Sequence, residues 1–353
     1  MKIWVEALTP KQILLFSYIQ DIFGRQNVFL TTRDYDLNAN LASKRWSRHF
    51  LVGRYPGASS IAKTRESIKR QEKLIDIVSS EKPDVHLTFV SPDSVRVAFG
   101  LGIPVITSSD SPHSDAVSRL TIPLSRIFVT PYFLLEDFEK YNRLVEVVGF
   151  EGVFELAWIL REKPDPKVPR ELGLEPFSYA LVRPGEEKSY YYPSPAFATR
   201  MPLSIARMIL RRTDLTVIVY PRYPDQALLY RRLLSRWNNR VKILEGATDF
   251  VSLEYHARLV ITGGGTMATE SALLGTPSIS TYPGELKVHK FIRKRGFPLY
   301  KAPLPQSFIE KLLLLETGPG ERERYIQRAK KTLQDPISVF AREITRIINR
   351  NEN

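Results

Sequence analysis

The chain has no cysteine among its 353 residues and only five histidines. The absence of cysteine excludes disulfide bonds, thiolate metal sites and a cysteine nucleophile. No two histidines lie three or four residues apart, as a zinc site on a helix requires, so we expect no bound metal. The histidines are His49, His86, His113, His256 and His289.

Long apolar runs are also missing. No stretch approaches the roughly 18–20 apolar residues that span a bilayer, and the start, MKIWVEAL, lacks the apolar core of a signal peptide and predicts a first strand. Hydrophobic content of 43% and charged content of 25% are typical of a globular protein. We expect a cytoplasmic protein, and its length favours two domains.

Acidic residues are fewer than basic ones, which gives a formal net charge of +13. Residues 1–150 carry 19 Lys+Arg against 16 Asp+Glu, and the remainder carries 32 against 22, so the excess belongs to the second half. A basic half suggests an anionic ligand, a nucleic acid or an anionic membrane surface; a solvated basic surface is the alternative. No helix-turn-helix, RNA-recognition or zinc-finger signature is found, which makes nucleic acid the weaker alternative.

A peripheral association with the inner face of the membrane is a further alternative for the partner. The helix predicted at residues 13–23, ILLFSYIQDIF, is rich in apolar residues. We expect the sheet to cover most of it, and a lipid-facing patch is the other interpretation.

Short apolar strands alternate with helices along both halves, which predicts an α/β fold with two doubly wound parallel sheets. We expect an N-terminal domain over residues 1–150 and a C-terminal domain over 177–335. The Pro- and charge-rich stretch REKPDPKVPRELGLEP lies in the linker predicted at 151–176. A final helix at 336–353 could pack back on the first domain. Ligands of such sheets bind outside the carboxyl ends of the strands, in the crevice.

The stretch LVITGGGTMATESALLGTPSIS, residues 259–280, has the strongest site signal. It predicts a buried strand, a turn of Gly263, Gly264 and Gly265, and a helix. Glycines allow close approach of a ligand, and the free N–H groups of the helix suit a diphosphate. Thr266 adds a hydroxyl, and Glu270, one turn on, could accept hydrogen bonds from a ribose diol.

The alternative for this stretch is a tight strand–helix turn with a surface glutamate. It is not a P-loop, because no Gly-Lys-Ser/Thr follows, and it does not match G-x-G-x-x-G. We include Met267 among the candidate nucleotide-sugar-binding residues.

The segment GGGTMATESALLGTPSIS resembles the donor-binding segment of GT-B glycosyltransferases and of non-hydrolysing UDP-N-acetylglucosamine 2-epimerases. In those families the glycine turn receives the diphosphate, and the glutamate of an E-x-x-x-x-G-x-P pattern binds the ribose. Glu270, Gly275 and Pro277 match that spacing. The segment ILEGATDFVSLEYHA resembles the part that closes round the nucleobase, which implies base contacts from the backbone at 244–247, including Gly246.

Together with MKIWVEALTPKQ, DSPHSDAVSRLTIPLSRIFVTPYF and FELAWI, these motifs make the whole chain similar to an archaeal and bacterial family, domain of unknown function 354. The resemblance implies a GT-B-like fold of two Rossmann-like domains facing across a cleft. It implies no cofactor, since the UDP-sugar or related nucleotide sugar is a substrate, and no obligatory metal. The lack of cysteine and the many charged residues hint at a thermophile.

Candidate catalytic groups of the first half lie in SSDSPHSDA, directly after a predicted strand. Asp110, His113 and Asp115 lie within six residues, and an Asp–His pair is what a general base for an acceptor hydroxyl needs. The alternative is that Asp110 or Ser111 caps the helix that follows.

Arg183 is a further candidate nucleotide-sugar-binding residue, and Lys11, Asp93 and Arg222 are secondary candidates. Arg183, at the end of a predicted strand, could bind a diphosphate or form an interdomain salt bridge, and Arg222 has a similar position. Lys11 follows the first strand, in what is otherwise an ordinary turn. Asp93 also follows a strand, where a capping role is the alternative.

The leading interpretation is a GT-B-type glycosyltransferase that moves a sugar from a nucleoside diphosphate to an unidentified acceptor. A nucleotide-sugar 2-epimerase is the alternative, although its G-T-R-P-E and H-R-R-E-N motifs are replaced here by EALTPKQ and VRPGEEK. A third interpretation is a non-catalytic nucleotide- or nucleic-acid-binding protein. The oligomeric state stays open.

Overall fold

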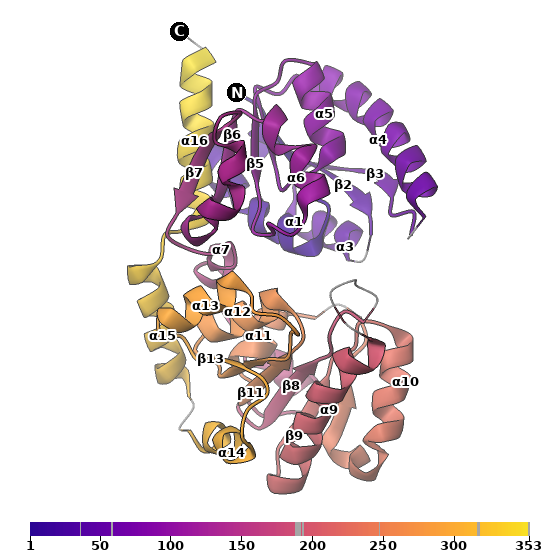
Figure 1. Ribbon diagram of the computed structural model, residues 1–353, viewed down its shortest axis with the longest axis vertical. Helices are drawn as coiled ribbons and strands as arrows, with labels where there is room; N and C mark the ends of the chain where they lie inside the picture. The colour runs from indigo at the N-terminus through magenta and orange to yellow at the C-terminus, as the bar shows by residue number, and fades with distance from the viewer. Residues whose placement is uncertain are drawn as a thin grey trace. The chain divides into compact units, whose positions relative to one another are not determined.

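The computed structural model describes residues 1–35, 37–57, 59–187, 192, 194–246, 248–315 and 318–351. The chain divides into two compact units. Unit 1 comprises Met1–Trp158 and Leu333–Asn353, and unit 2 comprises Ile159–Thr332 (Figure 1). The first eight residues of the expected linker, 151–158, therefore belong to unit 1.

Unit 1 contains a seven-stranded parallel sheet, in the order β3-β2-β1-β4-β5-β6-β7. In the centre, Ile3 of β1 pairs with Val28 of β2 on one side and Val85 of β4 on the other. The strands are β1 (Ile3–Glu6), β2 (Val28–Asp34), β3 (His49–Arg54), β4 (Val85–Thr88), β5 (Val105–Ser108), β6 (Ile127–Pro131) and β7 (Glu146–Phe150).

Helices cover this sheet, and one core cluster joins Trp4, Phe29 and Val52 of the strands to Leu74 and Val78 of α4. The α-helices are α1 (Pro10–Ser17), α2 (Ile19–Phe23), α3 (Asn38–Arg45), α4 (Ser60–Glu81), α5 (Pro92–Gly100), α6 (Asp115–Arg119), α7 (Leu156–Ile159) and α16 (Pro336–Asn351). The 3-10 helices are η1 (Arg25–Asn27), η2 (Ile122–Leu124) and η3 (Tyr132–Tyr141).

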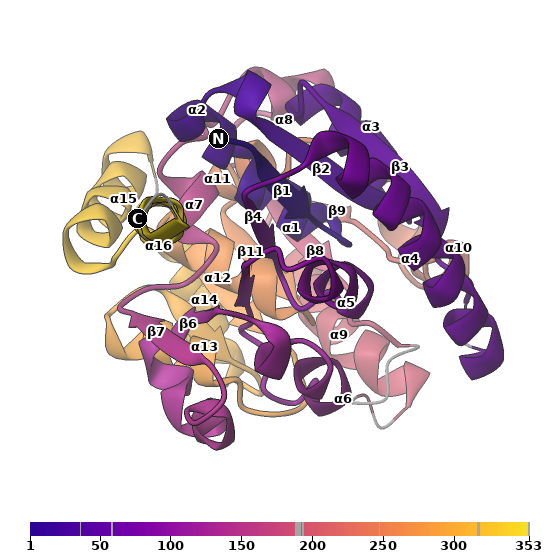
Figure 2. The ribbon, with the colours of Figure 1, turned by 90° about the horizontal axis from the view of Figure 1, so that it is seen from above.

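The apolar helix predicted at 13–23 is two helices, α1 and α2, joined at Tyr18. Ile13, Phe16 and Ile19 are buried, as the interpretation of a sheet-covered helix expects. The C-terminal helix α16 packs against α1 and α2 of unit 1 (Figure 2). The rings of Phe16 and Phe340 pack edge to face, with their centroids 5.4 Å apart. Among the described helices, none has the length and apolar composition needed to cross a membrane.

Unit 2 contains a six-stranded parallel sheet, in the order β10-β9-β8-β11-β12-β13. The strands are β8 (Tyr179–Arg183), β9 (Thr216–Val219), β10 (Val241–Ile243), β11 (Leu259–Thr262), β12 (Ser278–Ser280) and β13 (Leu299–Lys301). The helices are α8 (Lys167–Glu171), α9 (Pro195–Arg212), α10 (Pro224–Leu233), η4 (Ser235–Arg240), α11 (Phe250–Tyr255), α12 (Gly265–Leu273), α13 (Lys287–Lys294), α14 (Gln306–Leu314) and α15 (Pro319–Thr332).

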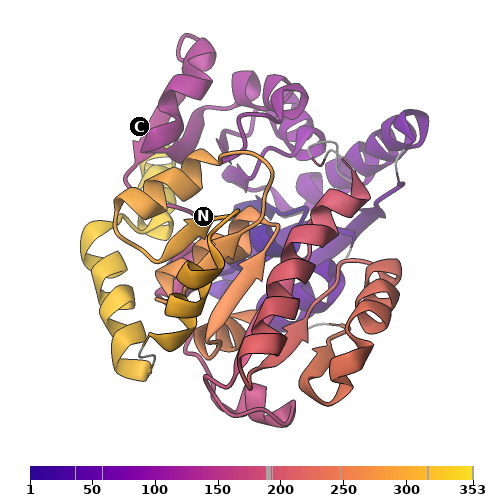
Figure 3. The same cartoon turned by 60° about the horizontal axis from the view of Figure 1, so that its bottom comes forward.

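Both faces of this sheet are covered. In Figure 3 the red helix α9 lies across one face, where Ala206 and Ile209 pack with Val182 of β8 and Ile261 of β11. On the other face, Leu253 of α11 and Met267 of α12 pack with neighbouring strand residues. Apolar strands buried on both sides are what a doubly wound parallel sheet requires.

The strand order reverses at one place in each sheet, between β1 and β4 in unit 1 and between β8 and β11 in unit 2. The connections from these neighbouring strands depart in opposite directions, which leaves a crevice outside their carboxyl ends. Residues directly after β8 and β11 therefore occupy the position where such sheets bind ligands.

Candidate functional site

The glycine turn follows β11 at this reversal in unit 2. The amide of Gly263 donates a hydrogen bond of 3.0 Å to the carbonyl of Arg183, at the end of neighbouring β8. A Cβ on Gly263 would lie 2.4 Å from the Cα of Gly185, so only glycine fits between the two chain segments. The three-glycine sequence thus brings the ends of β8 and β11 into direct contact.

The helix α12 begins at Gly265 without a side-chain cap, and Gly264 is its N-cap residue. The amide of Gly264 donates to the hydroxyl of Thr262 at 3.0 Å. The next amides, of Gly265, Thr266 and Met267, belong to the first turn, whose N–H groups have no acceptor within the helix. With the helix dipole, they form a position suited to an anion.

The side chain of Arg222 lies beside this helix end. A Cβ on Gly264 would lie 3.0 Å from Nη2 of Arg222, and Nη1 of the same guanidinium pairs with Glu186 at 3.5 Å. The guanidinium of Arg183 lies over the ring of Tyr220, 4.1 Å from its centroid, and 5.9 Å from that of Phe250. The positive charge of Arg222 adds to that of the helix end.

Glu270 is half-buried, one turn into α12, and it interacts with a second acid, Glu254 of α11. Glu254 is fully buried, and one of its oxygens accepts a hydrogen bond of 2.8 Å from Ser271. Burial, followed by the charge of Glu270, raises the pKa of Glu254 well above its usual range. A protonated Glu254 leaves the pair with one negative charge, on Glu270.

His289 of α13 supports the first residue of α12 from the far side. Its Nε2 lies 3.4 Å from the carbonyl oxygen of Gly265. Burial lowers the pKa of His289 to about 4, so the imidazole is neutral at pH 7. A neutral ring can donate to that carbonyl without placing another charge at the site.

Two other residues of the predicted set contribute differently. The side chain of Met267 is 7% exposed and belongs to the core, which leaves its amide as the group available to a ligand. Gly246 is exposed and has a φ of +92°, and a Cβ there would touch nothing within 4 Å. Ala247, of the predicted base-binding segment, lies outside the described residues.

In unit 1, the predicted Asp–His pair is replaced by a different arrangement. Asp110 forms an ion pair with Lys11, whose Nζ lies 2.6 Å from a carboxylate oxygen of Asp110 and 2.8 Å from one of Glu155. Burial alone would lower the pKa of Lys11, but both acids raise it; Lys11 in turn lowers the pKa of Asp110 against the effect of burial. Burial raises the pKa of Glu155.

His113 and Asp115 lie apart from this cluster. His113 is exposed, and none of the described hydrogen bonds or ion pairs joins it to either aspartate. Asp115 instead binds Arg119 at 2.7 Å and contacts Lys140. The capping alternative is also wrong, because the N-cap of α6 is Ser114 rather than Asp110 or Ser111. A catalytic role for these residues stays a prediction.

Asp93 takes part in a second buried network. It binds Nη1 of Arg70 at 2.7 Å, and the other nitrogen of that guanidinium binds Glu6 at 2.5 Å. The side chain of Asp93 does not cap α5, whose N-cap is Ser91. Its carboxylate is therefore committed to Arg70.

Sequence analysis missed three residues that hold these sites together. They are Glu155, which binds Lys11, Glu254, which interacts with Glu270, and Tyr192, whose hydroxyl donates a hydrogen bond to the carbonyl of Gly263. A usable signal existed for the two acids, since each is a lone charge within an apolar stretch, VFELAW and FVSLEY. A charge is rarely buried unless it is paired, so such positions predict a partner. Tyr192 gave no comparable signal.

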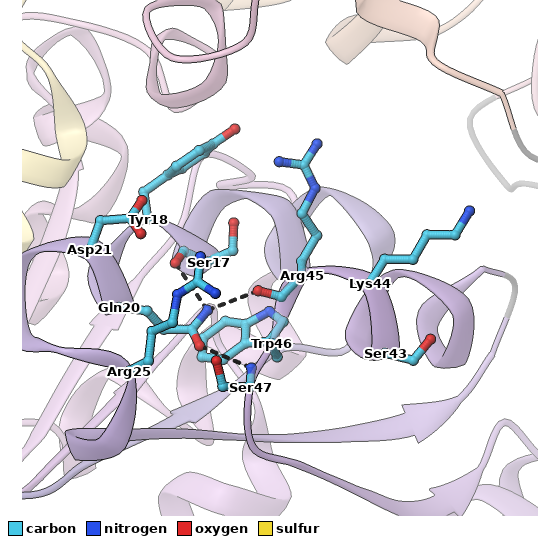
Figure 4. Close-up of a pocket in the computed structure, with 10 residues that line it drawn as sticks. All are labelled: Ser17, Tyr18, Gln20, Asp21, Arg25, Ser43, Lys44, Arg45, Trp46 and Ser47. Carbon is cyan, nitrogen blue, oxygen red and sulfur yellow. Dashed lines mark hydrogen bonds between the residues drawn. The ribbon is translucent and has the colours of Figure 1, made fainter.

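A hollow of about 520 Å³ lies elsewhere in unit 1, beside the ends of α1 and α3 (Figure 4). Each of these helices starts near the carboxyl end of the strand before it and runs back, so this hollow lies toward the amino ends of the strands. The side chain of Gln20 joins Ser17, Arg45 and Ser47 by the hydrogen bonds dashed in Figure 4. The side-chain amide of Gln20 is therefore occupied by hydrogen bonds within the protein.

Comparison with known proteins identifies relatives along the whole chain. The profile of the family described as "Protein of unknown function (DUF354)" matches residues 1–345. An uncharacterized protein from Methanocaldococcus jannaschii is 29% identical over 352 residues, which cover 96% of each chain.

Among solved structures, the UDP-GlcNAc 2-epimerase from Neisseria meningitidis, bound to UDP-GlcNAc, is similar with a TM-score of 0.68 and 15% identity, over 98% of this chain and 100% of that one. The glycotransferase of kitacinnamycin is similar with a TM-score of 0.59 and 12% identity, over 98% of both chains. These likenesses show a GT-B-like fold, with two parallel sheets, as the sequence predicted.

Proposed function

The chain belongs to the DUF354 family, and from that premise we propose that it is a glycosyltransferase that uses a nucleoside diphosphate sugar. Unit 2 binds the donor, and unit 1 supplies the groups that bind and activate an acceptor. The reaction joins an acceptor hydroxyl to the anomeric carbon, with the nucleoside diphosphate as leaving group and the hydroxyl proton passing to a base.

One observation carries the proposal: the uncapped start of α12 lies at the strand reversal, beside Arg222, with Glu270 one turn further on. The amides of this turn bind the diphosphate, and the helix dipole and Arg222 stabilise the charge that develops on it. The carboxylate of Glu270 binds the two ribose hydroxyls.

The choice of nucleotide draws on the fold relatives. The Neisseria epimerase binds UDP-GlcNAc, and a uridine nucleotide is therefore the first donor to test. The aromatic residues Tyr220 and Phe250, which flank Arg183, offer apolar surface near the same strand ends. No metal is needed to carry the diphosphate charge in this arrangement.

The fold relatives also support a second candidate, a nucleotide-sugar 2-epimerase. Two features favour transfer over epimerisation. The arginine- and histidine-containing motifs of the epimerases are absent from the sequence. In unit 1, Asp93 is ion-paired with Arg70, and the ion pair with Lys11 lowers the pKa of Asp110, which makes Asp110 a weak proton acceptor.

The test begins with binding of UDP, UDP-GlcNAc and UDP-glucose, measured by calorimetry and thermal shift. A ligand at 100 times its Kd should add about 2.7 kcal/mol to the free energy of unfolding. Glu270→Ala removes charge-assisted hydrogen bonds of about 1.5–3 kcal/mol each, so its Kd should rise at least about tenfold. Glu171→Ala, an exposed glutamate on α8, is the matched control and should bind as the wild type does.

The reaction is then followed by NMR of the sugar. Transfer that needs an added acceptor supports the glycosyltransferase, whereas a C2 epimer formed by the enzyme alone supports the second candidate. Equal binding of the nucleotide by the wild type and Glu270→Ala would remove the basis of the donor site.

A further inference from the structure

The long helix α4 of unit 1 is apolar on two sides. Its inner side packs Leu74 and Val78 into the core. Its outer side exposes three isoleucines: Ile61 is 69% exposed, Ile68 63% and Ile75 44%. A row of exposed isoleucines is uncommon on a helix, where charged and polar residues usually cover the solvent side.

The three isoleucines form one stripe. They are seven residues apart, and seven residues make almost two full turns, so each lies above the last with a drift of about 20°. From Ile61 to Ile75 the stripe rises by 14 residue steps, about 21 Å of helix at 1.5 Å per residue. In helices that pair with another helix, β-branched residues commonly repeat at this spacing in the a position of the heptad.

The helix stands free for such pairing. It lies along the β3 edge of the sheet, with its inner side against β3 and α5 (Figures 1 and 2). Its outer side carries, besides the isoleucines, exposed polar groups such as Arg65 and Glu72. Among the described residues of unit 1, no other element covers the stripe, as the exposed fractions of the three isoleucines show.

We propose that this stripe is the interface of a homodimer, in which α4 packs antiparallel against α4 of a second copy about a two-fold axis through Ile68. Ile61 of one copy then lies against Ile75 of the other. A two-fold axis uses the same surface on both copies, and a stripe that is symmetric about its middle residue meets that requirement.

The charges beside the stripe select the antiparallel direction. Arg65 and Glu72 each follow an isoleucine by four residues, which places them on the same flank of the stripe, in the e position of the heptad. With Ile68 on the axis, Arg65 of one copy comes opposite the second copy's Glu72, and the reverse holds at the other end. In a parallel pair the two e positions would lie on opposite sides of the seam, each beside a g position, so Arg65 of one copy and Glu72 of the other would not meet.

The remaining exposed charges of the helix fit this arrangement. Lys63, Lys69, Lys73 and Asp76 occupy the b, c and f positions, which turn away from the seam of a paired helix. Within one copy, Arg65 and Glu72 are seven residues apart, two turns along the helix, and form no described ion pair with each other. Their opposite charges are therefore available to the second copy.

The cysteine-free sequence allows a direct test, because each introduced cysteine is the only thiol. A disulfide requires Cα atoms less than about 7 Å apart. Ile68→Cys should oxidise to a covalent dimer, since the two copies of residue 68 meet on the axis. Ile22→Cys, 49% exposed on α2, is the control for random collision and should form little dimer.

Two further variants determine the direction. Ile61→Cys and Ile75→Cys should each form no disulfide-linked dimer when oxidised alone, because like residues lie about 21 Å apart in the antiparallel pair. An oxidised mixture of the two should give the 61–75 dimer. Dimers from each variant alone would establish a parallel pair and overturn the proposed arrangement.

The charge prediction is tested by sedimentation velocity over a concentration series. Arg65→Glu should raise the dimer dissociation constant at least about tenfold, and Arg65→Glu/Glu72→Arg should restore it. All these positions are exposed, so the circular dichroism spectrum of each variant should match that of the wild type. A wild type that sediments as a monomer at all concentrations, with Ile68→Cys no more cross-linked than Ile22→Cys, would refute the dimer.

Discussion

The hydroxyl of Tyr192 donates a hydrogen bond of 2.6 Å to the carbonyl oxygen of Gly263, the first glycine of the turn. The amide of the same glycine bonds to Arg183 on the neighbouring strand. Both backbone groups of Gly263 are thus fixed, and Tyr192 itself is buried. The start of α12 is held in place before any ligand binds, which reduces the ordering cost of binding.

Tyr192→Phe tests this preorganisation. The ring and its packing against Phe197 and Tyr282 remain, but the buried carbonyl of Gly263 loses its partner. We expect a loss of about 1 kcal/mol in the free energy of unfolding and a several-fold weaker affinity for the nucleotide. Calorimetric titration measures the affinity. Tyr55→Phe, exposed in unit 1, is the control, and a Tyr192→Phe affinity equal to the wild type would argue against the support role.

Gly263→Ala tests the close contact of the two strand ends. A Cβ at 2.4 Å from the Cα of Gly185 forces the backbone to shift, so we expect about 1–3 kcal/mol of destabilisation and loss of nucleotide binding. Gly320→Ala is a matched control that should change the free energy of unfolding in the opposite direction. Gly320 lies in α15 with open space around its Cβ position, so alanine there should stabilise the helix by up to about 1 kcal/mol. Urea unfolding measures both, and an unaffected Gly263→Ala would show that the turn tolerates a side chain.

The pair of Glu254 and Glu270 predicts a pH dependence of stability. Burial, then the charge of Glu270, raises the pKa of Glu254 in the folded protein above the ordinary value of 4.5. The folded state then holds a proton that the unfolded state releases, so this contribution to stability is complete below pH 4.5 and is lost as the pH rises through the folded pKa.

Glu254→Gln keeps a donor toward Glu270 but cannot titrate. The stability of the wild type relative to this variant should therefore fall as the pH rises above 4.5. Urea unfolding at a series of pH values measures the difference, with Glu171→Gln as the control at an exposed glutamate. A difference that does not change with pH would mean that Glu254 is ionised in both states.

Lys11→Met tests the part-buried cluster of Lys11, Asp110 and Glu155 in unit 1. Removing the cation leaves the carboxyls of Asp110 and Glu155 facing each other without compensation, which we expect to cost about 3 kcal/mol of unfolding free energy. Glu155→Gln should cost less, because Lys11 keeps its ion pair with Asp110. Chemical denaturation of both variants compares them, and equal stability would show that the cluster is dispensable for folding.

The architecture was predictable because local patterns determine it. Apolar strands such as 259–262, and helices that end at Gly24 and Gly275, have strong signals within a few residues, and α/β alternation then fixes a parallel, doubly wound arrangement. The glycine turn was predictable for the same reason. Its strand, glycines and helix are contiguous in the sequence.

The side-chain partners were not predictable, because they join distant segments. Lys11 meets Asp110 and Glu155 across 99 and 144 residues, and Glu254 meets an acid on the next helix. Asp110 and His113 are close in sequence, yet a βα loop can turn successive side chains in different directions. Spacing in a loop therefore predicts contact less well than spacing within a helix or strand.

His113 remains the best candidate for the acceptor base of the proposed transferase, because Asp110 is committed to Lys11 whereas the imidazole is exposed. We expect His113→Ala to lower kcat about 10²–10⁴-fold while leaving the affinity for the nucleotide unchanged, since it belongs to unit 1. Asp110→Asn should act through stability and should change kcat less. Steady-state kinetics with a transferring acceptor, combined with nucleotide titration, separates these effects. Undiminished turnover in His113→Ala would assign the proton to another group, and the part-buried Lys11 cluster would be tested next.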